Sequence, residues 1–187
     1  MMVRSFVAVP LPEKMQSDVF AAAQALSREL PAVKWSRKPG NLHVTVKFLG
    51  DVAEERLPEL GEALEQALAA RPRFEVEVRG LGAFPSRQKA SVVWAGIDDA
   101  GQGLAAVAQA VEAVAARFGV AKEERPFRGH VTVGRSKQGV DARAALDAWT
   151  DHLFGRVTVD EVHLYESQLG GDGSTYVLRS RATLARN

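Results

Sequence analysis

The chain of 187 residues is long enough for one domain or for two small lobes that share a core. Its hydrophobic share of 46% and charged share of 25% are typical of a soluble globular protein. The sequence contains no run of about 18 apolar residues, which is the length needed to span a membrane. The absence of cysteine excludes disulfides, thiolate nucleophiles and zinc fingers, and the start of the chain lacks a signal-peptide pattern, so a reducing cytoplasm is the expected compartment.

Apolar periodicity predicts alternating strands and helices in the first part of the chain. The expected elements are a strand over 6–9, a helix over 15–30, a strand over 42–49, a helix over 57–68 and a strand over 74–78. Pro31 would end the first helix, and Asp51 with Glu54 three residues later is a candidate cap for the second.

The second part of the chain repeats this order. The expected elements are a strand over 91–97, a helix over 104–118, a strand over 129–135, a short helix near Leu146, a strand over 157–167 and a last strand over 175–184. Thirty-seven residues separate Phe6 from His43, and 37 also separate Val93 from His130. We therefore expect an α+β fold over residues 1–187, a single domain with pseudo-repeat halves of about 1–83 and 84–187. Each half would form a lobe with an antiparallel sheet and outer helices, and the two lobes would meet at a cleft.

One tetrapeptide, His-Val-Thr-Val, occurs twice, at 43–46 and at 130–133. Side chains alternate along a strand, so the valines would face the core while His43, Thr45, His130 and Thr132 face the cleft. Two imidazoles can serve as general acid and general base in displacement at phosphorus, and hydroxyls can donate to the charged oxygens. A lone histidine on a strand is more often structural, but an identical second copy favours catalysis.

The net charge of +1 conceals two windows that contain four basic residues each and no acid, at 34–50 and at 125–140. Each window surrounds one tetrapeptide, which predicts a local attraction for phosphates. Continued alternation would turn Lys47 toward the cleft and Phe48 into the core. Alternation would also turn Arg135 away from the cleft, unless a bulge at Gly134 brings it back to bind phosphate.

The other two histidines are expected to have no part in the chemistry. His152 lies at the end of a predicted helix. His163 lies between the apolar Val162 and Leu164, so alternation predicts that its side chain faces solvent.

The chain resembles the two-histidine (2H) phosphoesterases, and within them the bacterial RNA 2',3'-cyclic phosphodiesterases, also called 2'-5' RNA ligases. The resemblance runs nearly end to end, through Arg4–Ala8, Trp35, Asn41–Gly50, Gly82–Pro85, Val93–Gly96, Pro126–Phe127, His130–Arg135, Leu164–Ser167, Gly173 and Tyr176. It implies that His43 is the proton donor, that His130 is the proton acceptor, and that Thr45, Thr132 and Arg135 hold the phosphate. The implied substrate is an RNA with a 2',3'-cyclic phosphate end, the implied product is a 2'-phosphate, and no metal or cofactor is expected. The family usually has proline before the second histidine, where this chain has Gly129, which could loosen the strand entry and shift His130.

Three other functions remain open from the sequence. The substrate could instead be a cyclic nucleotide, an ADP-ribose cyclic phosphate or a 2'-5'-linked oligonucleotide, because the same four side chains could act on each of them. These side chains would also serve the reverse reaction, which is ligation. A non-catalytic RNA-end binder would keep the pocket, although arginine and lysine would serve binding better than histidine. A histidine metal site lacks a carboxylate within either tetrapeptide. Nothing in the sequence requires more than a monomer.

Overall fold

Nine strands and four α-helices follow one another in a computed structural model, which describes residues 1–186. The strands are β1 (Met2–Pro10), β2 (Lys34–Trp35), β3 (His43–Ala53), β4 (Phe74–Pro85), β5 (Ala90–Asp98), β6 (His130–Val140), β7 (Leu153–Val159), β8 (Glu161–Gly170) and β9 (Gly173–Thr183). The helices are α1 (Glu13–Ser27), α2 (Leu57–Leu68), α3 (Gly103–Arg117) and α4 (Arg143–Asp147), with 3-10 turns at Pro39–Asn41 and Glu54–Arg56.

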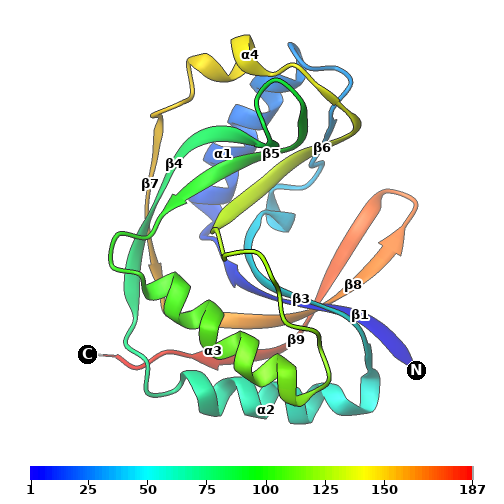
Figure 1. The fold of residues 1–187 in the computed structure, drawn as a ribbon, viewed down its shortest axis with the longest axis vertical. Helices are drawn as coiled ribbons and strands as arrows, with labels where there is room; N and C mark the ends of the chain where they lie inside the picture. Colours follow the sequence, from blue (N-terminus) through cyan, green and yellow to red (C-terminus); the bar gives the residue numbers. More distant parts are fainter. Residues whose placement is uncertain (187) are drawn as a thin grey trace.

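The strands form two antiparallel sheets (Figure 1). The first has the order β3-β1-β8-β9 and the second the order β2-β6-β5-β4-β7. This confirms the expected α+β class with two antiparallel sheets. Each sheet takes strands from both halves of the chain, and the expected boundary near residue 83 falls inside β4. The repeat is therefore one of element order, and the two sheets do not correspond to the two halves of the sequence.

The helices connect the two sheets. Each half contains a strand–helix–strand unit, β1-α1-β3 and β5-α3-β6, whose strands pair in one sheet while the helix packs against the other. Helix α1 contacts β6 and β7, α3 contacts β3, and α2 lies beside α3 and against β9 (Figure 1). The apolar stripe at Leu57, Leu60, Leu64 and Leu68 makes α2 amphipathic and is buried in this contact. The buried hydrophobic residues form one cluster that includes both sheets.

Two expected elements differ from the structure. The single strand over 157–167 is two strands, because the chain leaves the second sheet at Asp160 and enters the first, where β8 pairs with β1. Asp51 is not a helix cap, because β3 continues to Ala53 and α2 begins at Leu57 without a side-chain cap. Alternation and capping patterns are local, whereas these boundaries are set by the partners with which the strands pair.

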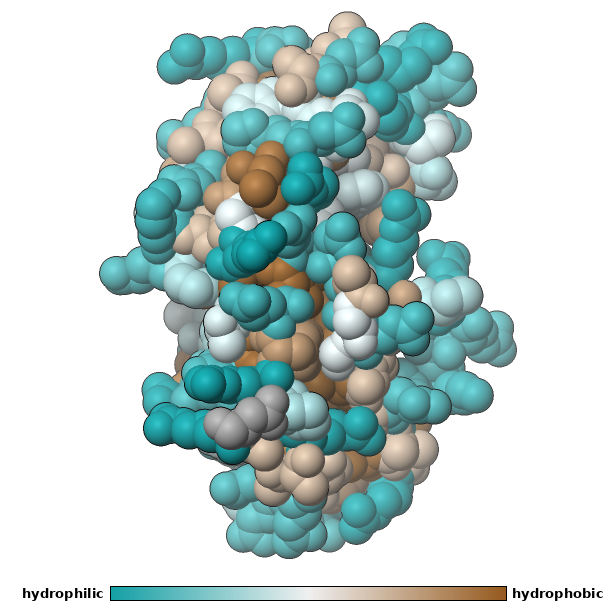
Figure 2. All heavy atoms as spheres, turned by 90° about the vertical axis from the view of Figure 1, so that its left-hand side faces the viewer, coloured by the Kyte–Doolittle hydropathy of each residue, from teal (hydrophilic) through white to brown (hydrophobic). Residues whose placement is uncertain are grey.

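The surface is mainly hydrophilic on the side that carries β4 and β7, with smaller hydrophobic patches exposed in its upper and middle parts (Figure 2). None of the helices within residues 1–186 is both long and apolar enough to cross a membrane.

A bulge interrupts both strands that carry the tetrapeptide. In the pairing of β1 with β3, Val7 lies opposite Lys47 and Ala8 opposite Thr45, so Val46 has no counterpart. In the pairing of β5 with β6, Val93 lies opposite Gly134 and Trp94 opposite Thr132, so Val133 has none. The extra residue is the last of the tetrapeptide in each copy, and it reverses the faces of the side chains that follow, in β3 as far as Leu49, where a second bulge reverses them again.

Candidate active site

The two histidines open equivalent strands that come together from different sheets. His43 is the first residue of β3, His130 is the first residue of β6, and these strands contact each other. His43, Thr45, Thr132 and Arg135 line one cavity of about 490 Å³. His130 lines a second cavity of about 510 Å³ that shares no lining residue with the first, and it lies two residues before Thr132 on the same face of β6. The structure therefore brings four of the five predicted residues into one cavity and places His130 in a second one, near enough for its charge to act on His43.

Both imidazoles are held in the same way. Nδ1 of His43 lies 2.7 Å from the carbonyl oxygen of Asn41, and Nδ1 of His130 lies 2.8 Å from that of Arg128. A carbonyl oxygen only accepts, so Nδ1 carries the hydrogen in each ring and Nε2 is the nitrogen that takes up or releases a proton. Nε2 of His43 lies 2.9 Å from the hydroxyl of Thr45. Nε2 of His130 has no hydrogen-bond partner within residues 1–186.

Aromatic rings fix the positions of both histidines. His43 stacks on Phe6 with ring centres 4.9 Å apart, and Tyr176 approaches its edge at 5.3 Å. His130 meets Phe84 edge to face at 5.2 Å. Tyr176 was not singled out as a site residue from the sequence, since it lies in a different part of the chain and only the pairing of β8 with β9 brings it here.

The surroundings lower the pKa of both histidines. Burial lowers the pKa of His43 from 6.5 to about 4. The hydrogen bond to the Asn41 carbonyl raises this pKa in part, whereas the charge of protonated His130 lowers it further. Burial also lowers the pKa of His130, aided by the charges of Arg135 and Arg128. Both rings are therefore mainly neutral at neutral pH in the free protein, and the nearby arginines make the cleft electropositive.

The bulges decide which basic residues face the cleft. Arg135 lines the cavity with His43, because the bulge at Val133 brings it back to the face of Thr132. The prediction that Lys47 faces the cleft is wrong, because the bulge at Val46 turns it inward. Its ammonium group lies 2.8 Å from Glu112 on α3, and the residue is only 8% exposed. Phe48, expected in the core, is 63% exposed and lines the cavity in its place. Lys34, Arg37 and Lys38 from the first basic window do line the cavity, as does Arg4.

The two remaining histidines line neither cavity. His152 is exposed and packs between Trp149 and Phe154. The prediction that His163 faces solvent is wrong: it is 7% exposed and hydrogen-bonded to Tyr165 and Glu161. A polar side chain between apolar neighbours can be buried when its two nitrogens are both satisfied, which alternation alone does not reveal.

Gly129, which replaces the usual proline, fits tightly packed surroundings. A Cβ atom at this position would lie 2.7 Å from Cδ2 of Leu104 and 3.3 Å from Cβ of Ile97. Leu104 and Ile97 therefore pack close to the backbone at this position, and the Arg128 carbonyl lies within hydrogen-bond distance of His130.

Comparison with known proteins identifies the family and supports the fold. The model of the 2'-5' RNA ligase superfamily matches residues 12–171. An RNA 2',3'-cyclic phosphodiesterase of Methanothermobacter thermautotrophicus is 32% identical over 94% of this chain and 96% of its own length. Among solved structures, a protein of Thermus thermophilus superposes with a TM-score of 0.79 at 27% identity over 97% of both chains. E. coli LigT complexed with 3'-AMP superposes with a TM-score of 0.76 at 26% identity over 99% of both chains.

Proposed function

This chain belongs to the 2'-5' RNA ligase superfamily, and we propose that it is an RNA 2',3'-cyclic phosphodiesterase that opens the cyclic end to a 2'-phosphomonoester. The similar proteins that carry this activity in their names match the chain over most of its length. The observation that carries the proposal is the pair of imidazoles. Each is fixed through Nδ1 to a carbonyl oxygen two residues earlier, which leaves both Nε2 atoms for proton transfer.

The proposed reaction is an in-line displacement of the 3'-oxygen by water. Nε2 of His130 accepts a proton from the water as it attacks phosphorus, since this nitrogen has a free lone pair. His43 donates a proton to the departing 3'-oxygen. Its ring is neutral in the free protein at neutral pH, so the proton is taken up together with the substrate, whose negative charge raises the pKa of the imidazole.

Three further side chains support the phosphate in this proposal. Thr45 and Thr132 lie two residues after the histidines on the same faces of β3 and β6, and their hydroxyls donate to the non-bridging oxygens. The hydroxyl of Thr45, 2.9 Å from Nε2 of His43, also orients that ring. Arg135 forms no ion pair within residues 1–186, so its guanidinium group is free to fork onto two phosphate oxygens.

We propose that the reaction needs no metal ion and that one chain suffices. No group of three or more histidine, aspartate or glutamate side chains within residues 1–186 is placed to hold a metal. Proton transfer and charge stabilisation are both supplied by the side chains described, and all of them come from one chain. After treatment with excess chelator and removal of the chelate, the enzyme should retain its rate on cyclic-ended RNA. Loss of most activity that a divalent ion restores would contradict this proposal.

The test of the function is product analysis on defined substrates. A short RNA with a 2',3'-cyclic end, a 2',3'-cyclic mononucleotide and an ADP-ribose cyclic phosphate would be compared at equal concentrations. We expect the RNA to have the highest kcat/KM and its product to resist an enzyme that is selective for 3'-phosphates. A higher kcat/KM for either small substrate would identify a nucleotide phosphodiesterase, and binding of the RNA without turnover would identify an RNA-end binder. A product that loses its phosphate readily would show that the leaving group is the 2'-oxygen.

A further inference from the structure

A two-stranded arm extends from the first sheet beside the cavity that contains His43. Strand β8 pairs with β1 only as far as Glu166, which lies opposite Ser5. Beyond that point, and within the part of the chain that the structure describes, residues 167–176 of β8 and β9 pair only with each other (Figure 1). We call residues 167–176 the hairpin tip. A hairpin of two strands has little stability of its own, so the position of the tip depends on its contacts with the rest of the protein.

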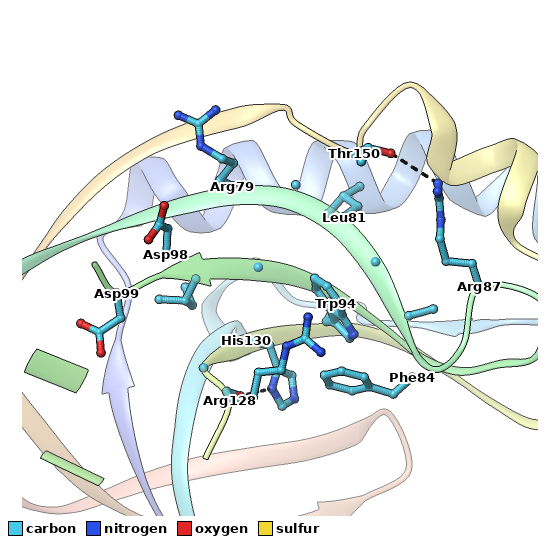
Figure 3. Close-up of a pocket in the computed structure, with 16 residues that line it drawn as sticks. Arg79, Leu81, Phe84, Arg87, Trp94, Asp98, Asp99, Arg128, His130 and Thr150 are labelled. Carbon is cyan, nitrogen blue, oxygen red and sulfur yellow. Dashed lines mark hydrogen bonds between the residues drawn. The ribbon is translucent and has the colours of Figure 1, made fainter. Parts of the chain in front are cut away.

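The hairpin tip forms part of the wall of the His43 cavity. Leu169 and Ser174 of the tip line this cavity together with His43. No residue of the tip lines the second cavity, where Arg128 lies beside His130 (Figure 3). The tip therefore belongs to the side of the cleft on which the proposed proton donor lies.

Leu169 presents an apolar side chain to this cavity. It shares one face of β8 with Ser167 and Tyr165, and Tyr165 stacks on Phe6, the ring that also stacks on His43. Leu169 is 79% exposed, whereas the two residues before it on this face are half-buried. Covering an exposed leucine with a ligand removes apolar surface from water, which favours binding. The side chain is therefore suited to contact the apolar face of a ribose or a base.

Asn41 is hydrogen-bonded to the tip and to His43 at the same time. Its side-chain Nδ2 donates to the carbonyl oxygen of Ser174 at 2.8 Å, and its own carbonyl oxygen lies 2.7 Å from Nδ1 of His43. Within residues 1–186, this amide is the one side chain outside β8 and β9 that is hydrogen-bonded to the tip. Both groups belong to one residue of the tight 3-10 turn at Pro39–Asn41, so a displacement of the tip would also displace the carbonyl that holds the ring.

A second contact links the tip to the same imidazole. Tyr176, two residues after Ser174 on β9, approaches the edge of His43 with the ring centres 5.3 Å apart. Tyr176 also meets Phe6 edge to face at 4.9 Å, and Phe6 is the ring on which His43 stacks. The tip and the proposed proton donor therefore belong to one packed unit.

The direction of the reaction indicates what the tip contacts. In an in-line displacement the attacking and departing oxygens lie on opposite sides of phosphorus. In the proposed reaction His43 serves the departing 3'-oxygen, so the ribose and base that carry this oxygen lie in the His43 cavity, against the tip. Resting on the proposed function, we propose that the hairpin tip holds this nucleoside through Leu169, and that Asn41 is a positioning residue that ties the tip to His43. Binding of the nucleoside then steadies the proton donor as well as the substrate.

The test is a double-mutant cycle on cyclic-ended RNA with Leu169→Ala, Asn41→Ala and the variant that combines them. We expect Leu169→Ala to raise KM about tenfold and to leave kcat unchanged, because it removes a contact with a part of the substrate that does not react. Asn41→Ala should raise KM about fivefold and lower kcat about fivefold, since it releases both the tip and the ring. In the combined variant KM should be no higher than in Leu169→Ala, because the released tip no longer carries the leucine, while the loss of kcat should persist.

Two variants serve as matched controls. Leu153→Ala removes another exposed leucine, which lies outside both cavities. Gln16→Ala removes an amide that donates to the carbonyl oxygen of Leu42 at 3.5 Å, next to Asn41 in the chain, and Gln16 lines neither cavity. Both variants should have the KM and the kcat of wild type.

Two results would overturn the inference and leave the proposed function standing. An unchanged KM in Leu169→Ala would show that the tip does not hold the nucleoside. Effects on KM that multiply in the combined variant would show that Asn41 does not act through the tip. If Asn41→Ala does not fold, Asn41→Asp takes its place in the cycle, because it keeps the shape of the side chain but cannot donate to Ser174. Failure of wild type to open the cyclic end would contradict the proposed function itself.

Discussion

At the scale of single residues, the two histidines share their anchoring and differ in their surroundings. The carbonyl oxygens of Asn41 and Arg128 fix the same tautomer in both rings. His43 is enclosed by Phe6 and Tyr176 and its pKa falls to about 4, whereas His130 borders the cavity beside Arg128 and is less buried. The repeated tetrapeptide predicted the pair from the sequence. The anchoring and the unequal burial could not be predicted, because they depend on residues outside the tetrapeptides and on the packing of strands distant in the chain.

These pKa shifts predict an acid-shifted pH profile. The reaction needs protonated His43 and neutral His130, and both pKa values lie below 6.5 in the free enzyme. The plot of kcat/KM against pH, which reports the free enzyme, should therefore be bell-shaped with its maximum below pH 6.5. The alkaline limb of kcat should lie at higher pH, because the bound phosphate favours the protonated ring. A kcat/KM that stays constant from pH 5 to pH 8 would contradict this assignment.

The acid limb needs a folding control. A histidine whose pKa is lowered on folding binds fewer protons in the folded than in the unfolded state, so stability falls as the pH drops from 6.5 toward 4. Circular dichroism at each pH separates this loss of structure from protonation of His130. Only the pH range in which the spectrum is unchanged enters the kinetic analysis.

At the scale of elements, the paired bulges decide the composition of the cleft. Alternation predicted the inward valines and the outward histidines and threonines correctly as far as Thr45 and Thr132. Beyond the bulges it failed for Lys47 and Phe48, since one extra residue exchanges the two faces. Gly134 suggested the second bulge, whereas Lys47 at the matching position of β3 gives no such signal. The ion pair with Glu112 shows why a lysine is tolerated there, because the carboxylate comes from α3, more than sixty residues away in the chain.

The two bulges predict that replacing Lys47 with methionine lowers stability, whereas replacing Arg135 with methionine lowers activity. Lys47→Met leaves the carboxylate of Glu112 without its buried partner, so the free energy of unfolding should fall by about 2 kcal/mol, while kcat and KM of the folded enzyme stay unchanged. Arg135→Met should instead lower kcat/KM on cyclic-ended RNA at least about tenfold with little change in stability. Denaturant titration and steady-state kinetics on both variants measure this split. A large kinetic defect in Lys47→Met would place that ammonium group in the cleft after all.

At the scale of the whole molecule, each strand–helix–strand unit pairs its strands in one sheet and packs its helix on the other. The order of elements and the spacing of the repeat could be predicted from the sequence, because periodicity is local. The packing of each helix on the opposite sheet could not be predicted. It depends on the pairing of β1 with β8, which joins residues about 160 positions apart, and on the core that the two sheets share. This packing of helices on opposite sheets brings β3 and β6 together and so forms the cleft.

The charge distribution over the whole cleft predicts a modest dependence on salt. Arg4, Lys34, Arg37, Lys38 and Arg135 line the cavity that contains His43, although the net charge of the chain is only +1. With roughly two or three phosphate contacts, the affinity for a short cyclic-ended RNA should fall with a log–log slope near about −2. A binding titration with a catalytically inactive variant at several salt concentrations measures this slope. An affinity that does not depend on salt would show that these side chains do not face the RNA.

The most direct test of the two-histidine mechanism is the activity of His43→Ala, His130→Ala and the double variant on cyclic-ended RNA. If both rings take part in one proton relay, each single variant should lose at least about 100-fold in kcat. The double variant should be little worse than either single one, as expected for groups that act as a unit. His152→Ala, which alters an exposed histidine outside both cavities, is the control and should retain full activity. A folded His43→Ala or His130→Ala variant that keeps most of its activity would contradict the mechanism.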